Sequence, residues 1–200
     1  MNDLDIVFAE FQTFAVKNKL PIISKLNPGI EIERSDLLTL SSEVVDTIIP
    51  IYQWKNGTSI LPPDNLGKLW LFDFGMFIPF SKALNLYHQG AGNVERWDTY
   101  KFPLFISGGG EFYLIECDKN DKNYGSIYFH SIGDFRFEYI VKKFDSLISL
   151  FKTIIKCFEE GAYFYNDQNE IKFNFELERE ISKRLNPDSG FWDLAHGSSE

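Results

Sequence analysis

Apolar residues recur at helical spacing in several long stretches of the chain, 3–18, 146–160 and 175–185, with polar residues between them. Because one face of a helix repeats every three or four residues, each stretch is predicted to be an amphipathic helix. The broadest apolar stripe lies in the second stretch and consists of Leu147, Ile148, Phe151, Ile154, Ile155 and Phe158. We therefore expect that helix to bury one face in the core of the protein.

Other helices are predicted with less regular boundaries. One is expected to begin near Ser35 or Asp36, either of which can cap it, and to continue to the segment 52–57. Pro50 is expected to bend or interrupt this helix, because proline removes a backbone hydrogen bond. A short helix is also expected over 79–88.

Shorter apolar runs, some with clear alternation, are typical of strands. These runs lie at 68–72, 102–107, 111–118, 125–132 and 135–141. Helices, then sequential strands, then helices again indicate an α+β fold. We expect a single domain in which an antiparallel sheet of about four to six strands packs against several helices.

The length of the chain, 200 residues, suits one domain. We expect this domain to span 1–186, because Asn186 and Pro187 end the last predicted helix. Residues 187–200 are expected to form a C-terminal tail. The first residues lack the basic and apolar regions of a signal peptide, so a cytoplasmic protein is expected.

The charge of the chain restricts its partners. Its 29 acidic and 20 basic residues give a net charge of −9. This charge disfavours nucleic acid and anionic membranes as partners and favours a basic protein. No apolar run approaches the length of a membrane span. Cys117 and Cys157 stand outside any metal-like or redox spacing, so both are expected to be buried free thiols.

The glycines at 108–110 could be taken for a phosphate-binding loop. However, the lysine and hydroxyl residue of that motif do not follow, and the glycines lead into a strand instead of a helix. A tight turn between two strands is the better interpretation.

Other polar residues also favour structural roles. Ser146 precedes an apolar helix and is predicted to cap it, and Cys117 lacks the cationic setting that activates a thiol. A conceivable metal or acid–base cluster consists of Glu111, Glu116, Asp118 and His130, but no second histidine stands at a ligand spacing. We interpret this set as a polar rim, with Asp118 in turn hydrogen bonds. We expect no catalytic residue, no metal and no cofactor, and hence no enzyme.

The segment 90–100 is the best candidate for a partner-binding surface, because it is rich in glycine and loops often carry recognition. Its candidate contact residues are Glu95, Trp97, Asp98 and Tyr100. Trp97 could anchor a partner, since an aromatic ring buries a large area at a low cost in conformational entropy. The alternative is that Trp97 packs inward against the sheet, as large aromatic residues more commonly do.

An ordered series of short motifs covers the chain from Ile32 to Trp192. The motifs are the helix running into 52–57, the run 70–72, Trp97 with 102–105, the glycines 108–110, the strands 113–118 and 125–130, the segment 144–147, Asn186 with Pro187, and Trp192. In this order they resemble the SMI1/KNR4 family, also called the SUKH superfamily. The chain departs from the family's pattern before the Asn-Gly pair, where Ile48, Ile49 and Pro50 stand out of register with the usual Leu-Pro.

The resemblance implies a non-catalytic, protein-binding module of the bacterial immunity-protein type. Such a protein would bind a cognate toxin domain in the cytoplasm and neutralise it. The acidic balance of this chain suits a basic toxin, such as a nuclease. The alternative is a scaffold or regulatory interaction domain, as in the fungal members, which are linked to cell-wall signalling. The family shares no catalytic residues, so none is carried over to this chain.

Overall fold

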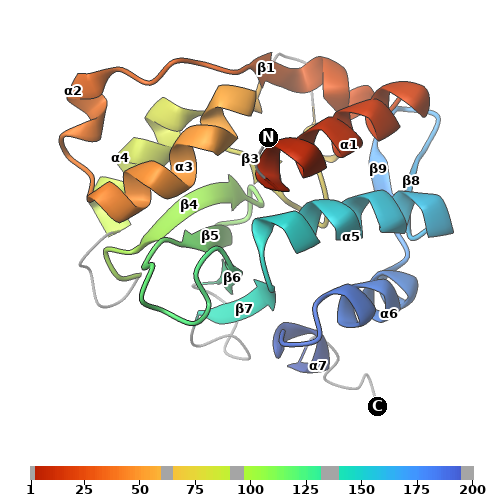
Figure 1. The fold of residues 1–200 in the computed structure, drawn as a ribbon. Coiled ribbons are helices and arrows are strands. Elements are labelled where there is room, and N and C mark those ends of the chain that lie inside the picture. The colour runs from red at the N-terminus through yellow and green to blue at the C-terminus, as the bar shows by residue number, and fades with distance from the viewer. Residues whose placement is uncertain (1–2, 60–64, 91–96, 132–139, 195–200) are drawn as a thin grey trace.

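The computed structural model describes residues 3–59, 65–90, 97–131 and 140–194. A five-stranded antiparallel sheet lies at its centre, with strand order β3-β4-β5-β6-β7 (Figure 1). The strands of this sheet are β3 (Met76–Phe77), β4 (Lys101–Ile106), β5 (Phe112–Glu116), β6 (Ile127–His130) and β7 (Val141–Phe144). Two small antiparallel pairs accompany it, β1 (Leu26–Pro28) with β2 (Lys55–Thr58) and β8 (Tyr163–Tyr165) with β9 (Ile171–Phe173).

Helices pack over the sheet, and the C-terminal helices lie beside its β7 edge (Figure 1). They are α1 (Asp3–Lys17), α2 (Arg34–Leu37), α3 (Ser42–Trp54), α4 (Phe80–Gly90), α5 (Leu147–Glu160), α6 (Phe175–Leu185) and α7 (Phe191–Leu194), with short 3₁₀ turns η1 (Pro21–Lys25) and η2 (Leu66–Lys68). The predicted α+β fold, one domain with an antiparallel sheet, is confirmed. Within the described ranges, every helix is too short or too polar to cross a membrane.

One aromatic cluster joins the helices over the sheet. Phe8 and Phe11 of α1 meet Trp54 of α3 and Phe151 of α5. The rings of Phe8 and Trp54 are stacked with centroids 4.5 Å apart, and Phe151 meets each of them edge-on, at 5.2 and 5.3 Å. Stacked and edge-on contacts are the favoured geometries of aromatic pairs, so α1 is held between α3 and α5 by specific contacts.

The ends of α5 follow from its sequence. The Ser146 hydroxyl accepts a hydrogen bond from the amide of Ser149, and the Ser149 hydroxyl accepts one from the amide of Ser146, both at 2.9 Å. This reciprocal pair is a capping box. Gly161 ends the helix with a φ of 81°, which glycine adopts without strain. The predicted helix and its cap are confirmed, and Phe151 and Ile154 are buried, whereas Phe158 is only partly so.

The second predicted helix begins later than expected. A helical turn, α2, is followed by a break, and α3 begins at Ser42 after Ser41, whose hydroxyl accepts a hydrogen bond from the amide of Val44. The serine at 41 therefore caps the helix in place of Ser35 or Asp36. Pro50 lies inside α3 without ending it.

The strand predicted over 68–72 is wrong. Residues 66–68 form η2, and the chain then reverses in a turn at 72–75, where the amide of Gly75 donates to the carbonyl of Phe72 at 2.8 Å. Phe74 adopts a positive φ of 53° in this turn. A short apolar run can be buried either as a strand or as a loop against the core, and hydrophobicity alone does not distinguish them.

The other predicted strands agree with the structure where it describes them. The run at 102–107 overlaps β4, which begins one residue earlier, and the runs at 111–118 and 125–132 contain β5 and β6. The strand predicted over 135–141 falls mostly on 132–139, outside the described residues. The final strand of the sheet, β7, starts at Val141 and continues to Phe144.

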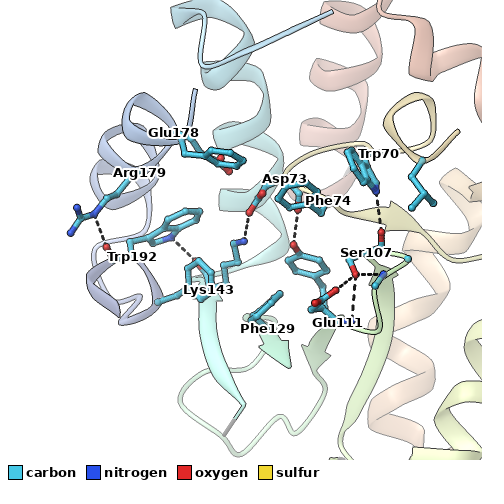
Figure 2. A pocket seen from close by; sticks show the side chains of 16 residues that line it. Trp70, Asp73, Phe74, Ser107, Glu111, Phe129, Lys143, Glu178, Arg179 and Trp192 are labelled. Atoms are coloured by element: carbon cyan, nitrogen blue, oxygen red, sulfur yellow. Dashed lines mark hydrogen bonds and ion pairs between the residues drawn. The ribbon is translucent and has the colours of Figure 1, made fainter. Parts of the chain in front are cut away.

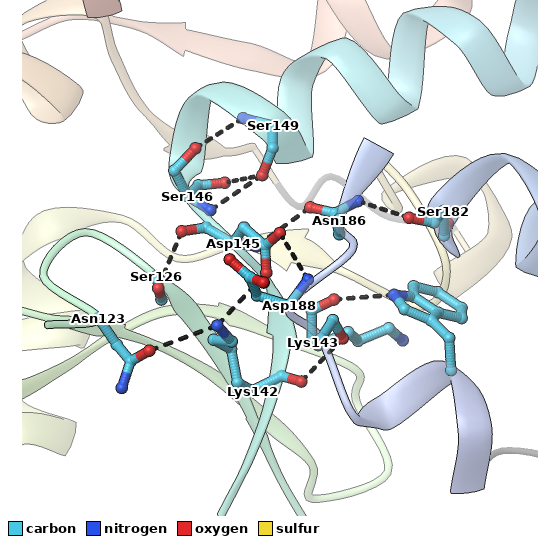
Figure 3. A network of polar contacts seen from close by, with 12 residues as sticks. Asn123, Ser126, Lys142, Lys143, Asp145, Ser146, Ser149, Ser182, Asn186 and Asp188 are labelled. Carbon is cyan, nitrogen blue, oxygen red and sulfur yellow. Dashed lines mark hydrogen bonds and ion pairs between the residues drawn. The ribbon is translucent and has the colours of Figure 1, made fainter. Parts of the chain in front are cut away.

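The segment after α6 packs onto the sheet, so the expected tail at 187–200 is corrected for residues 187–194 (Figure 3). The amide of Asp188 donates to the Asp145 carboxylate at 3.1 Å, and the Ser189 hydroxyl donates to the carbonyl of Lys142 at 2.9 Å. Phe191 and Trp192 of α7 are buried. The physical reason is that two large aromatic residues bury enough apolar surface to order the segment.

Phe151→Ala should lower the free energy of unfolding by about 3–5 kcal/mol, because it removes a buried ring from the cluster that joins three helices. Urea denaturation at one temperature measures the effect. The matched control is Phe164→Ala on β8, where the side chain is 51% exposed and the change should stay within about 0.5 kcal/mol. Equal effects of the two substitutions would show that the packing of α5 is not as described.

Candidate functional site

A cavity of about 670 Å³ lies between the sheet, the helices α6 and α7, the turn that joins β4 to β5, and the segment 66–75 (Figure 2). Its volume is in the range of small-ligand sites. Its wall is mainly apolar and includes seven aromatic residues, and a few charged side chains converge on it (Figure 2). This combination of an apolar wall with few polar groups is typical of a binding site.

A β-bulge directs Lys143 into this cavity. Lys142 lies opposite Tyr128, and Phe144 lies opposite Ile127, the next residue of β6. Lys143 is therefore an extra residue without a partner on the neighbouring strand. A bulge of this kind changes the direction of a side chain, which explains how a lysine of the strand reaches the interior.

The ammonium group of Lys143 is enclosed by rings and by a carboxylate. Lys143 is 1% exposed, and its Nζ forms an ion pair with Asp73. Nζ also lies 4.2 Å from the ring centroid of Phe191 and 5.1 Å from those of Trp192 and Tyr113. The faces of aromatic rings attract cations, so these contacts offset part of the cost of removing the charge from water.

The turn at 72–75 presents Asp73 to this ammonium group. The Tyr113 hydroxyl, which comes from β5, donates a hydrogen bond to the backbone carbonyl of Asp73 at 2.6 Å. The side chain of Asp73 bonds to Lys143 of β7. The turn is thus attached to two strands of the sheet, through both the backbone and the side chain of one residue.

Glu178 of α6 is a second buried carboxyl group in the cavity, 1% exposed. Its Oε1 accepts a hydrogen bond from the Tyr163 hydroxyl at 2.5 Å. Burial raises the pKa of Glu178 well above its usual range; the nearby Asp73 carboxylate raises it further, and Lys143 opposes the change. The neutral acid is therefore favoured over a wider pH range than in an exposed glutamate.

The triple glycine forms one wall of the cavity. Gly108 and Gly110 have positive φ values of 89° and 109°, so the predicted tight turn between two strands is confirmed. The Ser107 hydroxyl accepts hydrogen bonds from the amides of Gly109 and Glu111 at 2.9 and 3.3 Å, and it contacts the Glu111 carboxylate. The sequence predicts the turn but not its place at a cavity.

Exposed apolar side chains surround the mouth of the cavity. Leu66, Phe74 and Phe175 are 42%, 37% and 49% exposed. The rings of Phe74 and Phe175 are stacked, and Trp70 meets Phe74 edge-on with centroids 4.8 Å apart. We call these four residues the mouth patch.

The predicted partner-binding residues lie elsewhere. Trp97 is 3% exposed and packs on Phe112 and Leu114, on the opposite face of the sheet from the core helices, so its ring is not available to a partner. A side chain at Gly90 would lie 2.2 Å from the Trp97 ring, which shows how closely the two residues pack. The inward-packed alternative is therefore the arrangement that the structure has.

Asp98 and Tyr100 remain on the surface, and Glu95 lies outside the described residues. The Asp98 carboxylate is 2.7 Å from Nζ of Lys101 and also accepts a hydrogen bond from the amide of Tyr100. Asp98 thus has a structural role beside any role in binding. Contact of these residues with a partner stays a prediction.

The predicted polar rim of Glu111, Glu116, Asp118 and His130 is wrong for Glu116 and His130, because both side chains are buried. Glu116 is 2% exposed and pairs with Lys101 at 2.7 Å, and His130 is buried. Burial alone would lower the pKa of Lys101, but hydrogen bonds to Asp98 and Glu116 raise it. Asp118 accepts a hydrogen bond from the amide of Asn120, so its predicted turn role is confirmed. Among the described residues, no group of histidine, cysteine and carboxylate side chains could hold a metal ion.

Both cysteines are buried free thiols, as predicted. Burial raises the pKa of the Cys117 thiol to about 12, and the pKa of Cys157 is raised for the same reason. The reactive thiolate is therefore disfavoured at both positions.

The sequence matches no model of a known protein family and no curated protein. Lys143 and Asp73 stand in elements that the pattern does not predict. Glu178 lies in the predicted helix over 175–185, but the periodicity of a helix does not show which residues of other elements it contacts.

Glu178→Gln should flatten the pH dependence of stability. Because the pKa of Glu178 is higher in the folded protein than its ordinary value of 4.5, this group contributes stability below pH 4.5 that is lost as the pH rises through the folded pKa. The free energy of unfolding of the native protein should fall in this window relative to the variant. The titratable groups that act on Glu178 come from other elements and are Asp73, Lys143, Tyr113, Tyr163 and Cys157.

Urea titrations at a series of pH values measure this difference. Glu180→Gln is the matched control, because Glu180 is an exposed residue of the same helix and the change in charge is identical. Parallel pH curves for the native protein and Glu178→Gln would contradict the raised pKa.

Lys143→Met should destabilise the fold by about 3 kcal/mol, because it leaves the Asp73 carboxylate without its cation. The effect should fall at the lower end of the range for buried pairs, since the Asp73 side chain is 12% exposed. Adding Asp73→Asn should recover part of the loss, which a double-mutant cycle measures by chemical denaturation. Strict additivity of the two changes would show that the pair is not coupled.

Proposed function

We propose that this chain is a protein-binding module that contacts its partner through the mouth patch. The exposure of Leu66, Phe74 and Phe175 around one cavity is the observation that carries this proposal. Single exposed apolar residues are common on protein surfaces, but adjacent ones around a hollow are typical of interaction sites.

The geometry of the mouth patch suits an anchor contact. Its aromatic rings already support one another, as the stacking of Phe74 with Phe175 shows, so little conformational entropy remains to be lost on binding. A partner side chain that enters the hollow would be surrounded by these rings and shielded from water. Such shielded pockets hold the few residues that dominate the energy of an interface.

The charge of the chain supports a basic partner. A net charge of −9 attracts such a partner over long range and increases the association rate. Association should therefore slow as salt rises, since the screening length falls to about 8 Å at physiological ionic strength.

We further propose that the partner is a toxin domain and that the chain is a cytoplasmic immunity protein of the SMI1/KNR4 type. The support for this step is the ordered series of motifs along the sequence, together with the acidic charge that suits a basic toxin such as a nuclease. Cys117 and Cys157 are buried, and Ser146 caps α5, so each of these residues has a structural role. These structural roles support a non-catalytic protein.

Phe74→Asn and Phe175→Ser should each weaken partner binding at least tenfold, because they remove exposed rings of the mouth patch. Asparagine suits position 74, since it tolerates the positive φ of that residue. Co-expression and pull-down first show whether the product of the neighbouring gene binds. The affinity of each purified variant for this product is then measured. Phe164→Ser is the control, because its ring is as exposed but lies away from the cavity on β8.

The outcomes separate the proposals. Full affinity in both variants would place the interface elsewhere, and substitutions at Asp98 and Tyr100 would then test the surface predicted from the sequence. A neighbouring gene that encodes no toxin, with no toxin among the captured proteins, would favour the regulatory alternative.

A further inference from the structure

The charged side chains of the cavity include more acids than bases. Asp73, Glu111 and Glu178 line it, against Lys143 and Arg179. The charge of Lys143 is already matched by the Asp73 carboxylate and by the ring faces around it. An anionic ligand would therefore compete with a carboxylate for this lysine and would lie close to further carboxyl groups.

Arg179 is also engaged. Its Nε donates a hydrogen bond to the backbone carbonyl of Trp192 at 2.8 Å. In Figure 2, the guanidinium group lies on the outer side of Trp192, away from Asp73. Both bases of the cavity wall thus have protein partners, and neither is placed to receive a ligand anion at the centre.

Unlike Lys143, which pairs with Asp73, Glu178 has no ion-pair partner of opposite charge among the described residues. Its hydrogen-bond partner Tyr163 is a neutral phenol. Burial and then the Asp73 carboxylate raise the pKa of this carboxyl, and Lys143 offsets only part of that rise. A ligand cation would supply the missing countercharge, and the resulting charged hydrogen bond would be stronger than a neutral one.

The wall between Glu178 and solvent suits the rest of such a ligand. Trp70, Phe74 and Phe175 present ring faces and edges at the mouth, and ring faces bind both apolar groups and cations. A volume of about 670 Å³ is larger than a single ammonium ion needs. The occupant should therefore carry its charge on an apolar body.

We infer that the cavity binds an organic cation, a protonated amine or guanidinium group carried on an aromatic or aliphatic body, with the cation at Glu178 and the body against the mouth patch. The cation is either a basic side chain of the protein partner or a free small amine. Only the first of these two sources rests on the proposed function. The chemistry is shared by the two sources.

The first experiment compares three small probes of similar shape by isothermal titration calorimetry with the isolated full chain. They are phenethylamine, phenethyl alcohol and hydrocinnamate, which carry a cation, a neutral group and an anion. Phenethylamine should bind at least tenfold more tightly than the alcohol, and hydrocinnamate more weakly than either. Equal affinities, preference for the anion, or no binding of phenethylamine would overturn the inference.

The second experiment locates the cation. Glu178→Gln should remove most of the preference for phenethylamine over the alcohol, and Glu180→Gln, the exposed control on the same helix, should leave it unchanged. The affinity of the alcohol reports whether the cavity of the variant is intact. In NMR spectra, the indole N–H signals of Trp70 and Trp192 should shift on titration, and that of Trp97 on the other face should not. Unchanged preference in Glu178→Gln would contradict the assigned position.

The pH dependence gives a further test. Phenethylamine should bind more tightly as the pH rises through the pKa of Glu178, because the ionised carboxyl is the form that pairs with the amine, whereas binding of the alcohol should change little. The groups facing Glu178 that also titrate or carry charge are Asp73, Lys143, Tyr113, Tyr163 and Cys157. An affinity for phenethylamine that is constant with pH would contradict the role of Glu178.

A capped dipeptide, acetyl-Phe-Arg-amide, distinguishes the two sources. Tighter binding of the dipeptide than of phenethylamine indicates a basic side chain of a partner, and the reverse indicates a free amine. These titrations need no protein partner, so they can succeed if the proposed interface is wrong. Loss of partner binding in the mouth-patch variants, without any binding of these cations, would retain the proposed function and reject the inference.

Discussion

The ion pair between Lys143 and Asp73 is the interaction on which the arrangement around the cavity depends. A buried ammonium group is tolerated only when its charge and hydrogen-bonding capacity are matched, because its removal from water is costly. Asp73 provides the charge, and the rings of Phe191 and Trp192 provide the rest of the enclosure. Trp192 also donates from its indole nitrogen to the Lys143 carbonyl at 2.9 Å. The contacts of the buried Lys143 thus fix the turn at 72–75, the strand β7 and the helix α7 relative to one another.

The elements that the sequence predicts well are those whose pattern is long or whose ends carry specific chemistry. The helix α5 combines a broad apolar stripe with a serine cap and a glycine stop, and each of these signals appears in the structure. The hairpin β8–β9 was not predicted, because strands of three residues are too short to show a period. The segment 68–72 shows the opposite error, since its apolar residues are buried by a turn instead of a strand.

The candidate site could not be predicted from the sequence for a related reason. Alternation along a strand fails at a bulge, and Lys143 enters the cavity because it occupies the extra position in β7. Trp192 falls in the predicted tail, although it lines the cavity. The glycines near Trp97 favour an open recognition loop, but one of them, Gly90, allows the ring to pack inward. A glycine beside a large aromatic can therefore indicate close packing as well as an open loop.

Buried charged side chains are paired differently on the two faces of the sheet, and this difference indicates where a ligand would bind. On the Trp97 side, Lys101 contacts both Glu116 and Asp98 at 2.7 Å, so its cation is matched by two carboxylates. On the cavity side, Asp73 and Glu178 share the neighbourhood of a single ammonium group, and Glu178 is left with a neutral phenol as its hydrogen-bond partner. A glutamine at 178 could keep an acceptor for the Tyr163 hydroxyl without placing a second acid beside Asp73. A positive charge from outside the chain would complete the site by pairing with the Glu178 carboxylate.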